Sequence, residues 1–325
     1  MQYVEIIKPV STPLVSIVIA ALNEATTITE TVDSLLKQSY SNFEIIIVND
    51  GSTDSTSALI RDYTDKRIRL IEQNNTGLTR ALINGCAEAN GLFIARQDCG
   101  DISMPERLEQ QVDALQSKPN IALVSMSTRF ITPAKEELFI VEQSERDARY
   151  GLIPAPGERY IGPPHHGSVM FRRDNYVAAG GYREQFKVAQ DIDLWTRLLD
   201  YGDHLSLKQI GYQATLRPHS ISMLHREFQL EMESYIRRCT DQRKKGHSDS
   251  DILLAVSKSN ESKERSKNTS GAEANYFYFL GSNLLQKNPS ASLYYLSKSL
   301  KLEPIQLKAL LKFCYAGFLS FVRRS

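Results

Sequence analysis

The sequence has few cysteines, no long hydrophobic run and almost no net charge, and each absence excludes a class of protein. Its four cysteines, at positions 86, 99, 239 and 314, lie far apart and lack metal-site spacing, which favours free thiols in a reducing compartment. No stretch reaches about 18 apolar residues free of charge, so no membrane-spanning helix is expected. The formal net charge of +1 gives no footprint for nucleic acid, and we expect no nucleic-acid partner.

The N-terminal segment MQYVEIIKPVSTP has no long apolar run and carries Glu5 early, so we expect no signal peptide and a cytoplasmic location. The composition is that of a soluble globular protein, with 42% hydrophobic and 24% charged residues. The length of 325 residues allows one large domain with an appendage, or two domains.

Short apolar segments alternate with segments of helical periodicity up to about residue 116. Strands are predicted over 15–20, 43–48, 68–71 and 91–96, and helices over 26–38, up to 63, over 76–89 and over 105–116. Further strands are predicted over 121–125 and 169–171, with an irregular segment over 133–165. This alternation predicts an α/β fold with a mostly parallel sheet, flanked by helices.

Polar side chains follow three of these strands at the point where each strand ends. They are Asn23 and Glu24, then Asn49, Asp50 and Ser52, and finally Asp98 and Asp101. The strand ends of a doubly wound sheet lie side by side, so we expect these residues to line one crevice. An acidic crevice needs a divalent cation to hold a polyphosphate. The glycine motifs of dinucleotide-binding and P-loop proteins are both missing, which argues against those classes.

The C-terminal third differs in composition. Segment 237–275 begins with a basic cluster and is mostly polar, and we predict a basic, polar linker there. Segment 276–303 regains helical periodicity. In 305–324, Lys308, Lys312, Ala316, Ser320 and Arg324 recur every four residues on an otherwise apolar surface. That pattern fits a helix lying in a membrane interface, and it also fits a terminal helix packed on the protein's own core or on a dimer partner.

Eight short segments carry a resemblance to a known family. In chain order they read VSIVIAALNE, IIIVNDGSTDST, NNTGLTRALINGC, IARQDCGDISMPERLEQQ, HHGSVMFRR, AAGGYRE, AQDIDLWTRL and RPHSIS, and they span residues 14–222. In this order they resemble the family-2 glycosyltransferases of the GT-A fold. The resemblance implies a Rossmann-like, mostly parallel sheet flanked by helices, with a helical C-terminal appendage. Residues 1–236 would form the nucleotide-sugar-binding and catalytic domain, and 276–325 the helical C-terminal region.

The resemblance also implies an inverting transfer of a hexosyl or N-acetylhexosaminyl group from a nucleoside diphosphate sugar, with UDP as the nucleotide. The acceptor would be a glycan or lipid-linked glycan in surface polysaccharide biosynthesis, at the inner face of the cell membrane. A catalytically silent nucleotide-sugar-binding or scaffold protein of the same fold is the alternative. A nucleotidyltransferase shares the sheet, but the segment AALNEATT lacks the glycine-rich, basic first loop that such enzymes usually need.

Several donor-binding roles follow from the resemblance. Asn23 and Glu24 would contact the nucleoside, and Asp50 would accept a hydrogen bond from the base. Arg80 would lie near the diphosphate. Adjacent residues of a strand point to opposite faces, so at most one histidine of HHGSVMF would reach the crevice, and we assign His166 there.

The metal-binding element departs from the family pattern. Asp98 matches the first carboxylate of the family's Asp-x-Asp element, but Gly100 stands where relatives usually carry the second. Three outcomes are open: Asp101 takes over as a ligand, Arg80 and His219 hold the phosphates in a metal-poor site, or activity is lost. Phosphates and water can supply further ligands, so we expect Asp98 and Asp101 to form an altered site for Mn²⁺ or Mg²⁺ with activity retained.

Asp191 in AQDIDLW lies where the family carries its catalytic base, which takes the proton of the acceptor hydroxyl. Alternatively, Asp191 caps a helix over 192–199. Asp193 would orient the helix start or an acceptor group. Arg183 would contact sugar or phosphate, or form a surface ion pair. His219 would reach the diphosphate or metal when a C-terminal loop closes, or be an ordinary loop histidine.

Overall fold

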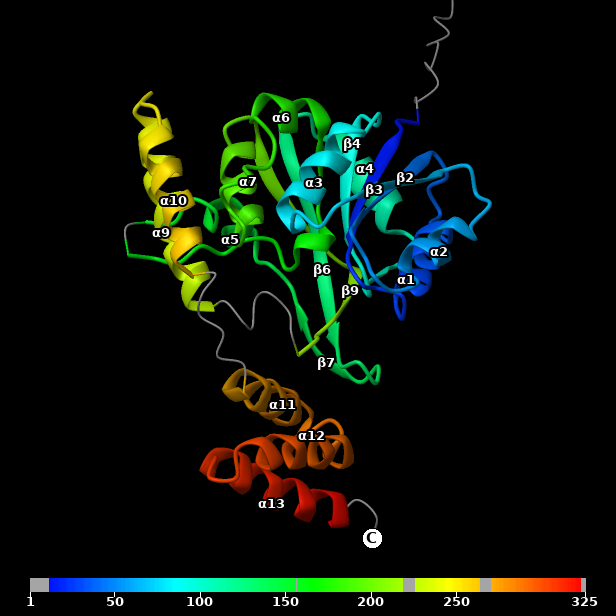
Figure 1. The fold of residues 1–325 in the computed structure, drawn as a ribbon, viewed down its shortest axis with the longest axis vertical. Coiled ribbons are helices and arrows are strands. Elements are labelled where there is room, and N and C mark those ends of the chain that lie inside the picture. The colour runs from blue at the N-terminus through cyan, green and yellow to red at the C-terminus, as the bar shows by residue number, and fades with distance from the viewer. Residues whose placement is uncertain (1–11, 156, 219–225, 264–269, 323–325) are drawn as a thin grey trace, which may run out of the picture.

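The computed structural model describes residues 12–155, 157–218, 226–263 and 270–322. Within them, one nine-stranded sheet forms the centre of the molecule (Figure 1). Its strands lie in the order β3-β2-β1-β4-β8-β6-β9-β5, and β7 pairs with β6 off this path. In chain order they are β1 (Val15–Ala21), β2 (Phe43–Asp50), β3 (Ile68–Gln73), β4 (Phe93–Asp98), β5 (Ile102–Ser103), β6 (Ile121–Ile131), β7 (Glu137–Val141), β8 (Met170–Arg172) and β9 (Asp203–Thr215).

The N-terminal half of the sheet is parallel, as the strand–helix alternation predicts. β1 lies between β2 and β4, parallel to both, and β2 is parallel to β3. β8 runs antiparallel to β4 and β6, so the other half is mixed. The predicted α/β fold class is confirmed, although β6 extends well beyond the short strand expected there and β9 was not predicted. β7 crosses part of the segment 133–165 that we expected to be irregular.

Helices cover both faces of the sheet because successive strand residues point to opposite sides. Ile17 packs in a cluster with α1 and α4, whereas the adjacent Val18 packs in a second cluster with α3 and α7. The helices of this region are α1 (Ile28–Leu36), α2 (Thr56–Arg61), α3 (Leu78–Ala87), α4 (Arg107–Ser117), α5 (Glu145–Tyr150), α6 (Arg173–Ala178) and α7 (Gln190–Leu198), with a 3-10 turn, η1 (His166–Ser168).

The segment predicted as a polar linker, 237–275, is helical up to 263 in its described residues except over 245–249. It contains the end of α9 (Arg226–Lys244) and all of α10 (Ser250–Lys263). The prediction of a linker is wrong here because sparse apolar residues recur at helical spacing. Met232, Ile236 and Cys239 of α9 pack with Ile252 and Val256 of α10 in a small core. The division of the chain into domains stays a prediction.

Three further helices form the C-terminal region below β7 in Figure 1. They are α11 (Ser270–Leu284), α12 (Pro289–Leu302) and α13 (Leu307–Val322). Tyr276 and Leu280 of α11 pack against Leu138 of β7, which attaches the unit to the sheet. α13 contacts α12 through Ala309 and Ala316. Among the described helices, none has both the length and the apolar character that crossing a membrane requires.

Candidate active site

A cleft of about 1180 Å³ opens beyond the carboxyl ends of β1 and β4. Five acidic side chains line it: Glu24 after β1, Glu30 of α1, Asp98 and Asp101 after β4, and Asp191 at the start of α7. Ligand pockets commonly measure roughly 300–1,000 Å³, so this cleft has room for a nucleotide with an attached group. The expectation that polar residues from separate strand ends meet in one crevice therefore holds for Glu24, Asp98 and Asp101.

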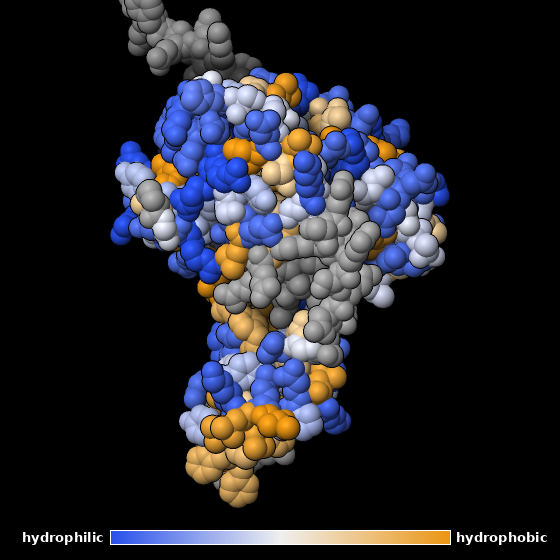
Figure 2. All heavy atoms as spheres, turned by 60° about the vertical axis from the view of Figure 1, so that its left-hand side comes forward, coloured by the Kyte–Doolittle hydropathy of each residue, from blue (hydrophilic) through white to orange (hydrophobic). Residues whose placement is uncertain are grey.

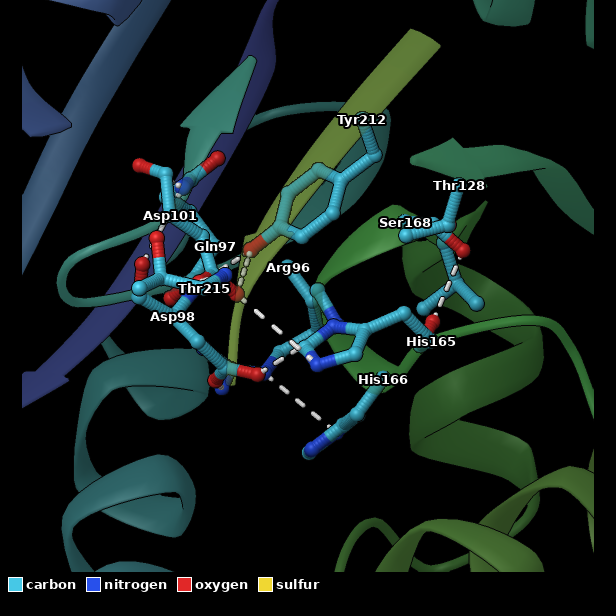
Figure 3. Close-up of polar contacts among 12 residues, drawn as sticks. Arg96, Gln97, Asp98, Asp101, Thr128, His165, His166, Ser168, Tyr212 and Thr215 are labelled. Carbon is cyan, nitrogen blue, oxygen red and sulfur yellow. Dashed lines mark hydrogen bonds and ion pairs between the residues drawn. The ribbon is translucent and has the colours of Figure 1, made fainter. Parts of the chain in front are cut away.

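Asp98 is held by a buried arginine of its own strand. Arg96 Nη2 lies 2.5 Å from Asp98 Oδ1, and Arg96 also donates to the carbonyl of Val18 on the neighbouring strand (Figure 3). Burial alone would raise the pKa of Asp98, but Arg96 and the other basic side chains around it together outweigh burial, and the pKa lies below the ordinary value. Asp98 is therefore ionised at neutral pH.

Asp101 is fixed by the end of β9. Its Oδ1 accepts a hydrogen bond from Thr215 N (2.9 Å) and its Oδ2 one from the Tyr212 hydroxyl (3.1 Å). Thr215 Oγ1 in turn donates to the carbonyl of Gly100 at 3.0 Å. Burial and the charge of Asp98 raise the pKa of Asp101 well above its ordinary value. β9 thus positions the whole loop from Asp98 to Asp101.

His165 completes a group of side chains that could hold a cation. One ligand atom from each of Asp98, Asp101 and His165 lies within 4.8 Å of the others. Burial lowers the pKa of His165, which favours the neutral imidazole that metals bind. Two carboxylates and an imidazole fit a divalent cation such as Mn²⁺, with remaining positions for water or phosphate oxygens. The predicted pair Asp98 and Asp101 is thus brought together, with His165 as an additional member.

Both histidines of the HHGSVMF segment line the cleft, so the prediction that at most one would do so is wrong. The reason is local: residues His166–Ser168 form the 3-10 turn η1, not a strand. His166 Nε2 lies 2.7 Å from the Tyr182 hydroxyl and 3.3 Å from Arg96 Nε. Burial and the charge of Arg96 lower the pKa of His166 to about 3, so its ring is neutral.

Asp191 lies in the first turn of α7 and lines the cleft. The N-cap of α7 is Ala189, in the left-handed region with φ 56°, and no side chain caps the helix there. Asp191 Oδ1 accepts a hydrogen bond from the backbone N–H of Ile192 at 2.9 Å. Burial raises the pKa of Asp191 to about 6. The left-handed backbone of Ala189, a non-glycine residue, stores strain, which is common at functional sites.

Asp193 has a different environment and does not line the cleft. Its side chain is 1% exposed and forms an ion pair with Arg197 at 2.5 Å. Arg183 lies 3.8 Å from Asp193 and pairs at 2.7 Å with Asp249, which precedes α10. The ion-pair alternative for Arg183 is therefore the one that the structure supports.

Three other predicted donor residues lie outside the residues that line this cleft. Asp50 accepts hydrogen bonds from the backbone N–H groups of Thr76 (2.9 Å) and Gly77 (2.8 Å), because the loop before α3 folds over it. Arg80 pairs with Glu184 beside a separate hollow. Asn23 Oδ1 accepts from Thr53 N at 2.8 Å, away from the cleft lining. His219 lies outside the described residues.

Two cationic residues that line the cleft, Arg217 and Lys135, were not predicted from the sequence. Arg217 follows β9 and lines the cleft, and its Nη1 donates to both carboxylate oxygens of Glu24 at 2.8 and 2.7 Å. In its segment, RPHSIS, the sequence pattern predicts a site residue only at His219. No spacing rule connects position 217 with position 24, so only the folded sheet brings them together.

Comparisons with known proteins identify relatives of this chain. The family model described as Glycosyl transferase family 2 matches residues 16–176. EpsE of Bacillus subtilis is 35% identical over 200 residues, which cover 59% of this chain and 69% of EpsE. The amylovoran biosynthesis glycosyltransferase AmsE of Erwinia amylovora is 28% identical over 174 residues, which cover 52% of this chain and 63% of AmsE.

Solved structures of the same architecture show the GT-A fold expected from the sequence. S. aureus TarS 1-349 in complex with UDP-GlcNAc aligns with a TM-score of 0.56 at 17% identity, covering 92% of this chain and 89% of TarS 1-349. The mannosyltransferase PcManGT from Pyrobaculum calidifontis, in complex with GDP-Man and Mn²⁺, aligns with a TM-score of 0.55 at 16% identity, covering 98% and 89%. At this identity, the likeness establishes the fold alone.

Proposed function

The chain belongs to glycosyltransferase family 2, and we propose that it is an inverting enzyme that moves a sugar from a nucleoside diphosphate donor to an acceptor hydroxyl. The observation that carries this proposal is a pair of carboxylates, Asp98 and Asp191, that line one cleft with pKa values moved in opposite directions. A raised pKa suits a residue that exchanges a proton, and a lowered one suits a residue that stays charged.

In the proposed reaction, Asp191 is the general base. The acceptor oxygen attacks the anomeric carbon as the bond from that carbon to the diphosphate oxygen breaks, and the hydroxyl proton passes to Asp191. One displacement inverts the anomeric configuration. Ile192 N–H holds one oxygen of Asp191, which fixes the direction of the carboxylate. His166, which lines the cleft and contacts the Tyr182 hydroxyl, would lie beside the reacting sugar.

A divalent cation is the proposed cofactor, with Asp98, Asp101 and His165 as its protein ligands. When bound, it would neutralise charge on the leaving diphosphate. Family membership and the donor set of the cleft support this assignment. Mn²⁺ is present with GDP-Man in PcManGT, whose fold this chain shares.

We propose UDP as the nucleotide and a hexosyl or N-acetylhexosaminyl group as the sugar. TarS, of the same fold, binds UDP-GlcNAc. Glu24 lines the cleft and keeps its proposed place near the nucleoside, whereas Asp50 would reach it only if the loop over Asp50 moved. Arg80 and Arg183 form ion pairs elsewhere, which leaves the diphosphate to other groups.

The proposed acceptor is a glycan or lipid-linked glycan of surface polysaccharide synthesis, reached at the inner face of the cell membrane. AmsE, a relative, is named for amylovoran biosynthesis. The outer surface of α13 is apolar: Leu307, Leu311, Phe318 and Phe321 are each more than 60% exposed. An apolar patch is visible at the lower end of the molecule, where α13 lies (Figure 2). Lys308 and Lys312 lie on the same helix, as in helices that rest on anionic lipid.

The basic cluster that begins the predicted linker gives less support to membrane contact. Arg237 donates to backbone carbonyls of Pro154 and Ala155, and Arg243 pairs with Asp200. These two cations therefore attach α9 to the sheet domain. The membrane proposal depends on α13.

Incubation of the purified protein with a panel of radiolabelled UDP- and GDP-sugars, with Mn²⁺ or Mg²⁺, tests the function. We expect release of labelled sugar or its transfer to a glycan acceptor, with the inverted anomeric configuration by NMR. The silent scaffold remains the second candidate, favoured by Gly100 in the acidic loop. Donor binding without turnover across the panel, equal in the wild type and in Asp191→Asn, would support the scaffold instead.

A further inference from the structure

Arg217 fills a space that the acidic loop leaves open. Gly100 lies in the left-handed region with φ +83°, and a Cβ built on it would overlap the guanidinium of Arg217. A side chain at position 100 and the observed position of Arg217 therefore exclude each other. Because Gly100 has no side chain, the guanidinium of Arg217, which follows β9, can reach the loop between Asp98 and Asp101.

Of the two terminal nitrogens of the Arg217 guanidinium, one has hydrogen-bond partners among the described residues and the other has none. Nη1 is held by Glu24, whereas Nη2 is buried without a hydrogen-bond partner among the described residues. An unpaired buried donor is unfavourable, so such a group in a cleft is a candidate for a ligand contact. The ion pair with Glu24 fixes the plane of the guanidinium and hence the direction of Nη2.

The other charges of the cleft leave the diphosphate with few partners. Glu24, Asp98, Asp101 and Asp191 line it, and a diphosphate adds further negative charge. Lys135, the second cationic side chain among the described lining residues, donates to both oxygens of Glu30 at 2.6 and 2.7 Å. Arg96 is fully buried and pairs with Asp98. Of the cationic side chains that the structure describes in the cleft lining, Arg217 alone combines a position at the acidic loop with an unused donor.

We propose that Arg217 binds the diphosphate of the donor, with Nη2 donating to a phosphate oxygen beside Gly100. The inference rests on the proposed function and adds the residue that recognises the leaving group. Arginine suits this role because its planar fork stays charged and matches phosphate geometry. Gly100 is then a matched partner of Arg217, and the loop gains a fixed positive charge at the position where a second carboxylate would recruit a metal ion. Part of the donor affinity is consequently independent of a divalent cation.

The test compares UDP with uridine by isothermal titration calorimetry, with EDTA present and then with Mn²⁺. A contact to phosphate affects UDP only, so the ratio of the two dissociation constants isolates it. We expect Arg217→Ala to weaken UDP about 10- to 100-fold in EDTA and to leave uridine within about twofold, as for loss of a charged hydrogen bond. Arg217→Lys keeps the charge without the planar fork, so its UDP affinity should lie between those of the wild type and Arg217→Ala. GDP and guanosine are run in parallel.

Lys135→Ala is the matched control, because it removes the other cation of the cleft and should leave UDP affinity unchanged. Thermal melts identify misfolded variants, and Arg217→Lys decides the outcome if Arg217→Ala does not fold. Equal UDP affinity in wild type and both Arg217 variants would overturn the inference, as would an equal loss for UDP and uridine. A wild type that binds neither UDP nor GDP, even with Mn²⁺, would overturn the proposed function and this inference together.

Discussion

Asp191 and Asp193 are separated by one residue of α7 and lie in opposite environments. Asp191 lines the cleft with its pKa raised to about 6, whereas Asp193 is buried against Arg197. Positions i and i+2 of a helix are turned away from each other, so one carboxylate faces the ligand and the other faces the core. The sequence AQDIDLW therefore contains one residue proposed for chemistry and one that holds the helix in place.

Asp191→Asn should reduce kcat about 100-fold or more, because an amide cannot accept the hydroxyl proton in the chemical step. The side chain keeps its shape, so the dissociation constant of UDP should change little. Single-turnover rates with the best donor of the panel, together with calorimetry, measure both. Activity that survives Asp191→Asn would show that another group is the base.

Asp193→Asn should lower the free energy of unfolding by about 3 kcal/mol, because it leaves Arg197 buried without its counter-charge. Urea denaturation measures this loss, and Asp191→Asn is the matched control on the same helix. Both variants remove one carboxylate from α7, so an equal effect on stability would contradict the assigned environments. The free energies are compared at the same pH.

The pH dependence of activity should follow the pKa of Asp191. The base works when ionised, so kcat/KM should fall as the pH decreases through about 6. Stability should change in the opposite sense. The folded pKa lies above the unfolded one, so ionised Asp191 opposes folding above about pH 6 and no longer does so below its ordinary pKa. Asp191→Asn should therefore raise the melting temperature more at pH 8 than at pH 4.

Gly100→Asp restores the acidic motif in sequence and should nevertheless impair the protein. The new Cβ would displace Arg217, and the aspartate would have to adopt a backbone φ of +83°. We expect a lower melting temperature and weaker UDP binding. Adding Arg217→Ala removes the overlap, so the double variant should lose less stability than the two separate losses predict. A single variant Gly100→Asp that gains Mn²⁺-dependent turnover at unchanged stability would contradict the matched pair.

Leu311→Ser with Phe318→Ser should reduce flotation with vesicles that contain anionic lipid, because both side chains are more than 60% exposed on α13. Their exposure means that folding should be unaffected. Leu254→Ser, on the exposed part of α10, is the matched control. Unchanged flotation would remove the membrane proposal, and a loss of dimers in light scattering would assign this surface to a second copy.

The parallel half of the fold was predictable because its strands and helices are local patterns. Strands around Val18 and Ile46 read as continuous apolar runs, and both are buried in the sheet. Asp98 and Asp191 were placed in one cleft by family motifs. The motifs contain these residues but do not show which of them meet. Arg217 contacts Glu24 across 193 positions, and Asp50 accepts hydrogen bonds from the backbone N–H groups of Thr76 and Gly77.

The hydroxyl of Tyr276 in α11 donates to the carbonyl of Leu216 at 2.9 Å, and Leu216 lies between Thr215, which holds the acidic loop, and Arg217. The C-terminal helices are thereby connected to the nucleotide side of the cleft through one short stretch of backbone. A surface or glycan that shifts α11 would also shift this stretch. A surface or glycan bound to the C-terminal helices would then alter the affinity of the cleft for the donor. By thermodynamic reciprocity, donor binding would alter the affinity of these helices for that surface or glycan by the same factor.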